Sequence, residues 1–258
     1  MLRLEKVNKR FGGVQAIYDC SLEVKQGSIT GLIGPNGAGK TTLFNTITGF
    51  QKPDSGRIFF KNEDVTGFQP HRLFHRGLFR TFQITKEYKD MTVLENLLLI
   101  PGNQVGEKFW NAWIKGRAIR EQEERNIEKA MEVLEFLEMD TKKDMRAKYL
   151  PGGEKKLLDL GRMMMVDLDM VLLDEPGAGV PPSLQNKVLD YVRRLSLEKG
   201  LTLFVVEHDM NVIMNLCDPI IVMTEGTVLT QGSPDEVRSD ERVIQAYLGE
   251  DQTEVSAP

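Results

Sequence analysis

An α/β fold is predicted by the order of helix-like and strand-like segments along the chain. After Leu150, the helical segment "EKKLLDLGRMMM" leads to the apolar strand "MVLLD", and a second helix leads to the strand "LTLFVVE". Closer to the N-terminus, the apolar run "SITGLIG" ends in glycine and precedes a helix that we expect from 40 to 48. Alternation of buried strands with helices is typical of a sheet of parallel strands.

The other segments differ in character. Residues 1–70 hold short strand-like runs separated by the turn-forming stretches "KQG" and "KPDSG". Residues 85–150 are helical in pattern, and Ile127, Met131, Leu134 and Leu137 repeat at the spacing of one helix face. The last residues, 251–258, are polar, and we expect them to be frayed.

The composition indicates a soluble globular protein. Of 258 residues, 41% are hydrophobic and 28% are charged, and the formal net charge is −5. This balance gives no general attraction to nucleic acid or to an anionic membrane surface. The first residues lack the apolar core of a secretion signal, and no apolar run is long enough to cross a bilayer. Cys20 and Cys217 lack metal-ligand spacing, so we expect core thiols in an intracellular protein.

A phosphate-binding loop is predicted where the first apolar strand ends. The stretch "GPNGAGKTT", from Gly34 to Thr42, fits the pattern G-x-x-x-x-G-K-[ST] between a strand and a helix. Glycines let successive backbone N–H groups surround a triphosphate at a helix N-terminus. Lys40 would place its charge between the β- and γ-phosphates, and Thr41 would offer its hydroxyl to Mg²⁺. The alternative is a chance glycine turn, which this spacing and context disfavour.

Two carboxylates follow the buried strand "MVLLD". Asp174 lies at the carboxyl end of that strand, where ligands bind in parallel sheets, and it could hold Mg²⁺. Glu175, the next residue, could polarise an attacking water. The alternative, two surface carboxylates at a strand end, fits poorly with so hydrophobic a strand.

A histidine follows the next buried strand. His208 in "LFVVEHD" could be a hydrogen-bonded structural residue, but its place beside the phosphate elements favours contact with a γ-phosphate. His71 and His75 have no such context, and we interpret them as surface or packing residues.

Together with "LPGGEKK", these motifs resemble the nucleotide-binding subunit of ATP-binding cassette (ABC) transporters. The resemblance covers residues 1–250. It implies a P-loop NTPase core with an N-terminal antiparallel β subdomain (1–83 and 166–250) and a helical insert (84–165) that carries the signature loop. It also implies hydrolysis of ATP with Mg²⁺ in a head-to-tail dimer, in which each ATP lies between one chain's phosphate loop and the other chain's signature loop.

The resemblance assigns roles residue by residue. An aromatic that stacks on adenine matches Phe11, and a glutamine that contacts Mg²⁺ and senses the membrane partner matches Gln83. Catalysis would fall to Glu175, His208 and Lys40, and the metal to Thr41, Gln83 and Asp174. The ATP-binding residues would be Phe11, Gly34, Pro35, Asn36, Gly37, Ala38, Gly39, Lys40, Thr41, Thr42, Gln83, Pro151, Gly152, Gly153 and Glu154.

A narrower resemblance is to subunits of branched-chain amino-acid importers, carried by "RTFQ", "MTVLENLL", "EHDMNVIMNLCDPIIVM", "QGSPDEV" and "VIQAYLGE". It implies a second ATPase chain, transmembrane permease subunits and, indirectly, a periplasmic binding protein as partners. The chain would lie peripherally on the cytoplasmic face of the cell membrane. None of these segments contacts the substrate, so the amino-acid assignment depends on similarity alone.

The chain departs from the family at two places. Its signature has Pro151 where the family has serine and Glu154 where it has glutamine, while Val180 and Pro181 replace polar residues after Walker B. Proline lacks the hydroxyl and the N–H that a serine offers. Both places act on the partner's ATP, which leads to the hypothesis of an asymmetric heterodimer whose trans site is the slower one. The alternative is that Pro151 is a neutral substitution.

Other functions remain as alternatives. A urea or short-amide importer or a lipid exporter could use a nearly identical cassette. A soluble ABC ATPase of DNA repair or translation would show a long coiled-coil insert or a second cassette, and the chain has neither; one of iron–sulfur assembly is harder to exclude. A non-hydrolysing binding module is disfavoured because Glu175 and His208 are both present.

Overall fold

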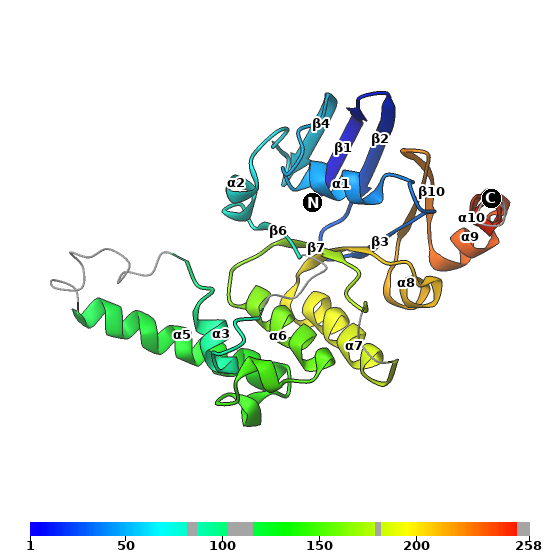
Figure 1. Ribbon diagram of the computed structural model, residues 1–258. Coiled ribbons are helices and arrows are strands. Elements are labelled where there is room, and N and C mark those ends of the chain that lie inside the picture. Colours follow the sequence, from blue (N-terminus) through cyan, green and yellow to red (C-terminus); the bar gives the residue numbers. More distant parts are fainter. Residues whose placement is uncertain (82–86, 103–115, 179–181, 252–258) are drawn as a thin grey trace. The chain divides into compact units, whose positions relative to one another are not determined.

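The computed structural model describes residues 1–81, 87–102, 116–178 and 182–251 (Figure 1). The chain divides into two compact units. The first comprises Met1–Gln83, Leu168–Gly177 and Val192–Pro258, and the second comprises Ile84–Asp167 and Ala178–Tyr191. The sequence had placed residues 178–191 with the core, and the functional domain boundaries stay a prediction.

A four-stranded antiparallel sheet occupies the N-terminal part of the first unit. Its order is β2-β1-β4-β5. The strands are β1 (Leu2–Phe11), β2 (Val14–Val24), β4 (Ser55–Phe60) and β5 (Glu63–Asp64). β1 and β2 form a hairpin, in which a tight turn at Gly12 and Gly13 pairs Val14 directly with Phe11.

A six-stranded sheet of order β10-β9-β3-β8-β7-β6 forms the rest of the unit's framework. All its neighbours pair in parallel except β9 and β10, which form an antiparallel hairpin. Residues of β3, β7 and β8 are almost entirely buried, as expected for central parallel strands. The α/β prediction is therefore confirmed. The strands are β3 (Ile29–Ile33), β6 (Leu78–Arg80), β7 (Met170–Asp174), β8 (Thr202–Val206), β9 (Ile220–Thr224) and β10 (Thr227–Gly232).

Helix α1 (Lys40–Ile47) lies between the two sheets (Figure 1). Its Leu43 and Phe44 are fully buried in one cluster with residues of both sheets, and the rings of Phe44 and Phe204 are 5.0 Å apart between centroids. This packing fixes the helix that follows the glycine-rich loop. The unit also contains α2 (Pro70–Phe74), α8 (Met210–Leu216), α9 (Pro234–Ser239), α10 (Glu241–Asp251) and the last turns of α7 (Pro182–Lys199).

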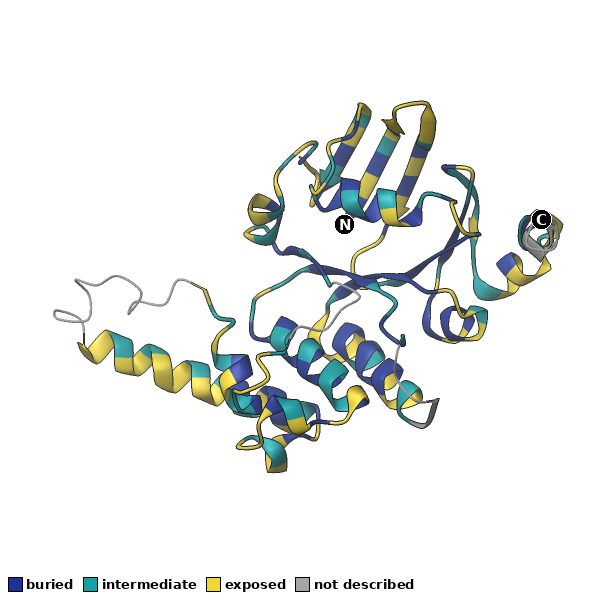
Figure 2. Cartoon of the chain, viewed as in Figure 1, coloured by how far each residue is buried: buried dark blue, intermediate teal, exposed yellow. Residues whose placement is uncertain are grey.

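The second unit is helical. Its elements are α3 (Val93–Leu98), α5 (Gly116–Phe136), α6 (Gly152–Met164), the first part of α7, and the short 3-10 helices η2 (Asp140–Lys142) and η3 (Ala147–Tyr149). Leu134 and Leu137 are buried as predicted, but Ile127 is 44% exposed. The prediction for Ile127 was wrong because the first turns of α5 present mostly exposed residues, as Figure 2 shows.

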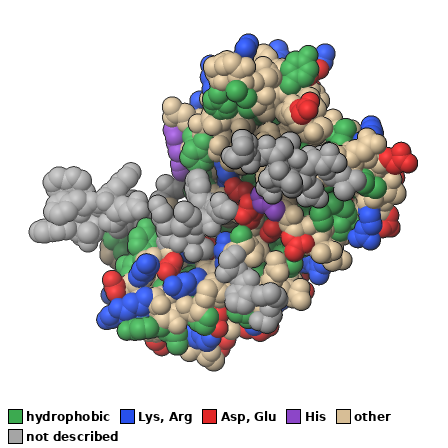
Figure 3. All heavy atoms as spheres, turned by 45° about the vertical axis from the view of Figure 1, so that its right-hand side comes forward, with side chains coloured by type: hydrophobic (Ala, Val, Ile, Leu, Met, Phe, Trp, Pro, Cys, Tyr) green, Lys and Arg blue, Asp and Glu red, His purple; other side chains and the backbone are tan. Residues whose placement is uncertain are grey.

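The surface carries charges of both signs. On the face drawn in Figure 3, acidic and basic side chains are interspersed among the described residues. No helix in the described ranges is long and apolar enough to cross a membrane. Cys20 and Cys217 are both buried and free, as predicted.

Candidate nucleotide site

The glycine-rich loop connects β3 to α1 and surrounds the side chain of Lys40. The ammonium of Lys40 is buried and donates to the carbonyl oxygens of Gly34, at 2.6 Å, and Pro35, at 2.9 Å. Asn36, Gly37 and Thr41 are exposed. Gly39 takes the N-cap position of α1, and no side chain caps the helix. No side chain therefore competes with an anion for the N–H groups of its first turn, and the anion site there stays a prediction.

Two neighbouring segments support the loop from one side. The N–H of Gly226, in the turn between β9 and β10, donates to the carbonyl of Ala38 at 3.1 Å, and the N–H of Tyr18 donates to the carbonyl of Gly226 at 2.9 Å. A Cβ built on Gly39 would lie only 2.4 Å from the carbonyl oxygen of Ala16 in β2. The loop is thus packed directly against the antiparallel sheet and the hairpin turn.

Because of this packing, we expect alanine substitutions at Gly39 and at Gly37 to affect the free energy of unfolding differently. We expect Gly39→Ala to lower the free energy of unfolding more than Gly37→Ala. Both residues have positive φ, 98° and 79°, so alanine costs about 1–2 kcal/mol at either position. Only Gly39 adds a backbone clash, since nothing lies within 4 Å of a Cβ on Gly37. Urea unfolding without nucleotide measures the difference, and equal losses would show that the loop yields to the clash.

Phe11 lies at the end of β1, on the hairpin whose second strand contacts Gly39. Its side chain is 45% exposed, and the ammonium of Lys9 lies 5.4 Å from the ring centroid. An exposed ring with a cation beside it can stack on a base. The stacking role assigned to Phe11 by resemblance stays a prediction.

Asp174, Glu175 and His208 lie at or just after the carboxyl ends of the neighbouring strands β7 and β8. Asp174 pairs with Val206 across the parallel strands, and the N–H of Glu175 donates to the carbonyl of Val206 at 2.9 Å. The distance from Oε1 of Glu175 to Nε2 of His208 is 2.8 Å. Glu175 is largely buried and His208 is 53% exposed at its side chain. Two of the three residues predicted for catalysis, Glu175 and His208, therefore lie in direct polar contact.

Arg80 is a site residue that the sequence analysis did not single out. It ends β6, and its Nη2 lies 2.6 Å from Oδ2 of Asp174, with side-chain exposures of 7% and 15%. Its Nη1 donates to Oδ1 of Asn45 in α1. The available signal was the basic residue in the "RTFQ" segment, which sits on the strand next to β7.

Glu207 is the second residue that the sequence analysis passed over. It lies between β8 and His208, is 6% exposed, and its Oε1 accepts the N–H of Gly177 at 2.9 Å. Burial raises the pKa of Glu207; the hydrogen bond from Gly177 opposes this, and the charge of Glu175 adds to it. The signal in the sequence was a glutamate directly after the apolar run "LFVV".

The signature residues lie in the helical unit. Pro151 is the N-cap of α6, it provides no side-chain cap, and its carbonyl accepts the N–H of Lys155 at 3.0 Å. Gly152 is exposed and Gly153 is buried. Oε1 of Glu154 lies 2.5 Å from the ammonium of Lys142. Gln83, Val180 and Pro181 lie outside the described residues, so the expectations for them stay untested.

Asp159 of α6 predicts a pH dependence of the chain's stability. Burial raises the pKa of this carboxyl from 3.8 to about 6, although Arg162 and Lys156 oppose the shift. The folded chain binds this proton more tightly than the unfolded chain. The protonated carboxyl of Asp159 therefore makes its full contribution to the free energy of unfolding below about pH 4, and this contribution is lost as the pH rises through about 6.

We therefore expect Asp159→Asn to raise the free energy of unfolding at pH 7, by about 1–3 kcal/mol, and to flatten its decline between pH 4 and 7. Urea titrations at several pH values measure both effects. Asp167→Asn is the control, because Asp167 pairs with Lys129 at a fully exposed position. A wild-type profile that does not decline in this range would contradict the prediction.

The oxygen donors at the site fit Mg²⁺. Thr41 offers a hydroxyl and Asp174 a carboxylate, both oxygen ligands of the type that Mg²⁺ prefers. Within the described ranges, no group of three or more His, Cys, Asp or Glu side chains could hold a metal by itself.

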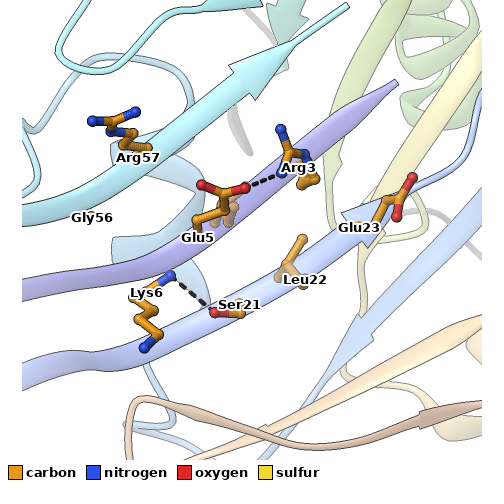
Figure 4. A pocket seen from close by; sticks show the side chains of 9 residues that line it. Arg3, Glu5, Lys6, Ser21, Leu22, Glu23, Gly56 and Arg57 are labelled. Atoms are coloured by element: carbon orange, nitrogen blue, oxygen red, sulfur yellow. Dashed lines mark hydrogen bonds and ion pairs between the residues drawn. The ribbon is translucent and has the colours of Figure 1, made fainter. Parts of the chain in front are cut away.

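A separate shallow hollow lies on the antiparallel sheet (Figure 4). Residues of β1, β2 and β4 line it, among them Arg3, Glu5 and Arg57, and the N–H of Lys6 donates to Oγ of Ser21 at 2.9 Å. Arg3 pairs with Glu5, so the charges of the hollow largely cancel. It contains none of the predicted nucleotide residues.

Known proteins resemble this chain over nearly its whole length. Residues 17–178 match the family model described as ABC transporter, and residues 227–253 match that of the branched-chain amino acid ATP-binding cassette transporter. A probable branched-chain amino acid transport ATP-binding protein LivG of Methanocaldococcus jannaschii is 40% identical, over 97% of this chain and 98% of its own length. The high-affinity branched-chain amino acid transport ATP-binding protein LivG of Escherichia coli K12 is 34% identical, over 97% and 98%.

Solved structures agree with these relatives. An ATP-binding cassette of an ABC transporter in its ADP conformation superposes with a TM-score of 0.83 at 40% identity, covering 96% of this chain and 98% of that one. A nucleotide-free ATP-binding cassette gives a TM-score of 0.81 at the same identity and coverage. The phosphate loop, the carboxyl ends of β7 and β8 and these similarities lead to one conclusion: the chain belongs to the ATP-binding subunits of ABC transporters, which are ATPases coupled to transport, and within them to the LivG type.

Proposed function

We propose that the chain hydrolyses ATP with Mg²⁺ to power the import of branched-chain amino acids through a pair of transmembrane permease subunits. The observation that supports hydrolysis best is the 2.8 Å contact between the carboxylate of Glu175 and the imidazole of His208, which follow the ends of the neighbouring strands β7 and β8. The relatives named for branched-chain amino acid transport support the substrate. A urea, short-amide or lipid transporter is the alternative that similarity leaves open.

In this mechanism the residues of the first unit bind and orient. The loop amides and Lys40 bind the β- and γ-phosphates, and Phe11 stacks on the adenine. Thr41 and Asp174 would hold Mg²⁺, with Gln83 as a further ligand, and the cation supplies charge neutralisation on the phosphate oxygens. Glu175 takes a proton from the attacking water, while the imidazole of His208, 2.8 Å from Oε1 of Glu175, fixes the direction of that carboxylate.

The proposed coupling to transport depends on a dimer. ATP held by one chain's phosphate loop would be contacted by the partner chain's signature loop, so that ATP favours the closed dimer over the open one. Pro151 removes one hydroxyl from the signature, while Gly152 and Gly153 keep their N–H groups. This supports a heterodimer in which the site completed by this chain's signature is the slower one. A substrate-binding protein would deliver the amino acid from the other side of the membrane.

Co-purification followed by reconstitution tests this function. The chain would be isolated with its membrane partners, placed in vesicles with the binding protein, and assayed for ATPase activity with leucine, isoleucine, valine or urea. We expect stimulation by at least one branched-chain amino acid and none by urea. If no branched-chain amino acid stimulates the ATPase activity, the proposed transport substrate is refuted. If the complex has no ATPase activity at all, the proposed hydrolysis of ATP is refuted.

A further inference from the structure

We infer that Glu207 is a positioning residue for Glu175: its buried carboxylate holds the N–H of Gly177 and thereby keeps Glu175 in the backbone conformation that points its side chain at His208. This inference rests on the proposed function, because it presumes that Glu175 acts on the attacking water. It adds a residue to which the sequence pattern gave no role.

The backbone of Glu175 needs such support. Its φ is +49°, a left-handed conformation that side-chain-bearing residues other than Asn and Asp seldom adopt. Residues in such conformations persist at functional sites only where the surrounding structure determines them from several sides. Glu175 is the first residue after β7, and the strand ladder ends there.

Two hydrogen bonds hold the segment that contains this conformation. At Glu175 itself, the N–H donates to the carbonyl of Val206 at 2.9 Å. Two residues later, the N–H of Gly177 donates to Oε1 of Glu207 at 2.9 Å. Both acceptors belong to β8 and the residue that follows it, so the segment from Glu175 to Gly177 is fastened to the neighbouring strand at both ends.

Glu207 also lies next to His208, the residue that contacts Glu175. It directly precedes His208 in the chain, so the residue that accepts the N–H of Gly177 is followed at once by the residue whose imidazole lies 2.8 Å from Glu175. Because Glu207 is 6% exposed, water cannot readily replace it as the acceptor for Gly177. Burial raises the pKa of Glu207, and the hydrogen bond that it accepts from Gly177 opposes this shift.

The experiment compares Glu207→Leu with Glu207→Gln in ATPase assays of the assembled complex. Glutamine keeps an oxygen acceptor for Gly177, and leucine does not. We expect Glu207→Leu to lower kcat about ten- to hundredfold with KM for ATP changed less than about threefold, because misplacing a reacting group costs rate without affecting the phosphate loop. Glu207→Gln should stay within about threefold of wild type in both constants.

A double variant separates positioning from general damage. If Glu207 acts only through Glu175, adding Glu207→Leu to Glu175→Gln should cause no further loss of kcat. Glu236→Leu is the matched control, since Glu236 also accepts a backbone N–H, that of Ser233 at 2.7 Å, but in the capping box of α9. We expect it to leave kcat unchanged.

The outcomes that overturn the inference are distinct from failure of the proposed function. A wild-type complex without ATPase activity refutes the function itself. If the wild-type complex is active, any of three results refutes the positioning role. These are an unchanged kcat in Glu207→Leu, an equal loss of kcat in Glu207→Gln, and a further loss of kcat in the double variant. If Glu207→Leu fails to fold, amide hydrogen exchange at Gly177 in the wild-type chain decides. Slow exchange is expected, and the rate of an exposed loop would overturn the inference.

Discussion

Replacing Glu175 with glutamine is expected to lower the ATPase rate of the assembled complex by about 10²- to 10⁴-fold, the usual contribution of a general base. Glutamine keeps the shape of the side chain and an oxygen that can accept from Nε2 of His208. The left-handed backbone is retained, and the phosphate loop is untouched. ATP binding should therefore persist while hydrolysis stops. Steady-state ATPase rates and equilibrium binding of ATP measure the two quantities separately.

Glu225→Gln is the matched control. Glu225 also has a positive φ, 48°, but it is exposed in the turn between β9 and β10. Its replacement should leave the rate unchanged, which would show that loss of a carboxylate at a left-handed position does not itself stop hydrolysis. A complex that retains full activity with Glu175→Gln would exclude Glu175 as the base and would also refute the asymmetric-heterodimer hypothesis.

Removing the buried charge of Arg80 is expected to destabilise the fold strongly. Arg80→Met leaves Asp174 buried without its cationic partner, and breaking a buried pair from one side costs about 3–5 kcal/mol. The substitution also removes the bond to Asn45, which connects the same arginine to α1. Urea unfolding of the nucleotide-free chain measures this loss.

Arg76→Met provides the comparison within the same chain. Arg76 pairs with Glu63 at 2.9 Å, but the side chains are 32% and 51% exposed. Because solvent screens such pairs, we expect a loss below about 1 kcal/mol. The double variant Arg80→Met/Asp174→Asn should recover part of the loss, since no unpaired carboxylate remains. Equal losses at Arg80 and Arg76 would show that the pair with Asp174 is not a strong one.

The sequence alone determined the elements of the phosphate site and their order. "GPNGAGKTT" between a buried strand and a helix predicts a loop whose N–H groups face an anion, because glycine spacing and helix termini are local properties. The apolar run "MVLLD" predicted β7 with its bounds for a similar reason, since parallel strands that are buried on both faces consist of such short apolar runs. The partners of Asp174 and Gly177 left no comparable signal.

Only the tertiary structure decided which residues support the predicted ones. Arg80 meets Asp174 because β6 and β7 are neighbours in the sheet, and Glu207 meets Gly177 because β7 and β8 are neighbours. Strand order is set by packing between segments far apart in the chain, so no local pattern contains it. The periodicity of α5 failed at Ile127 for the same physical reason: a helix face is buried only where another element covers it.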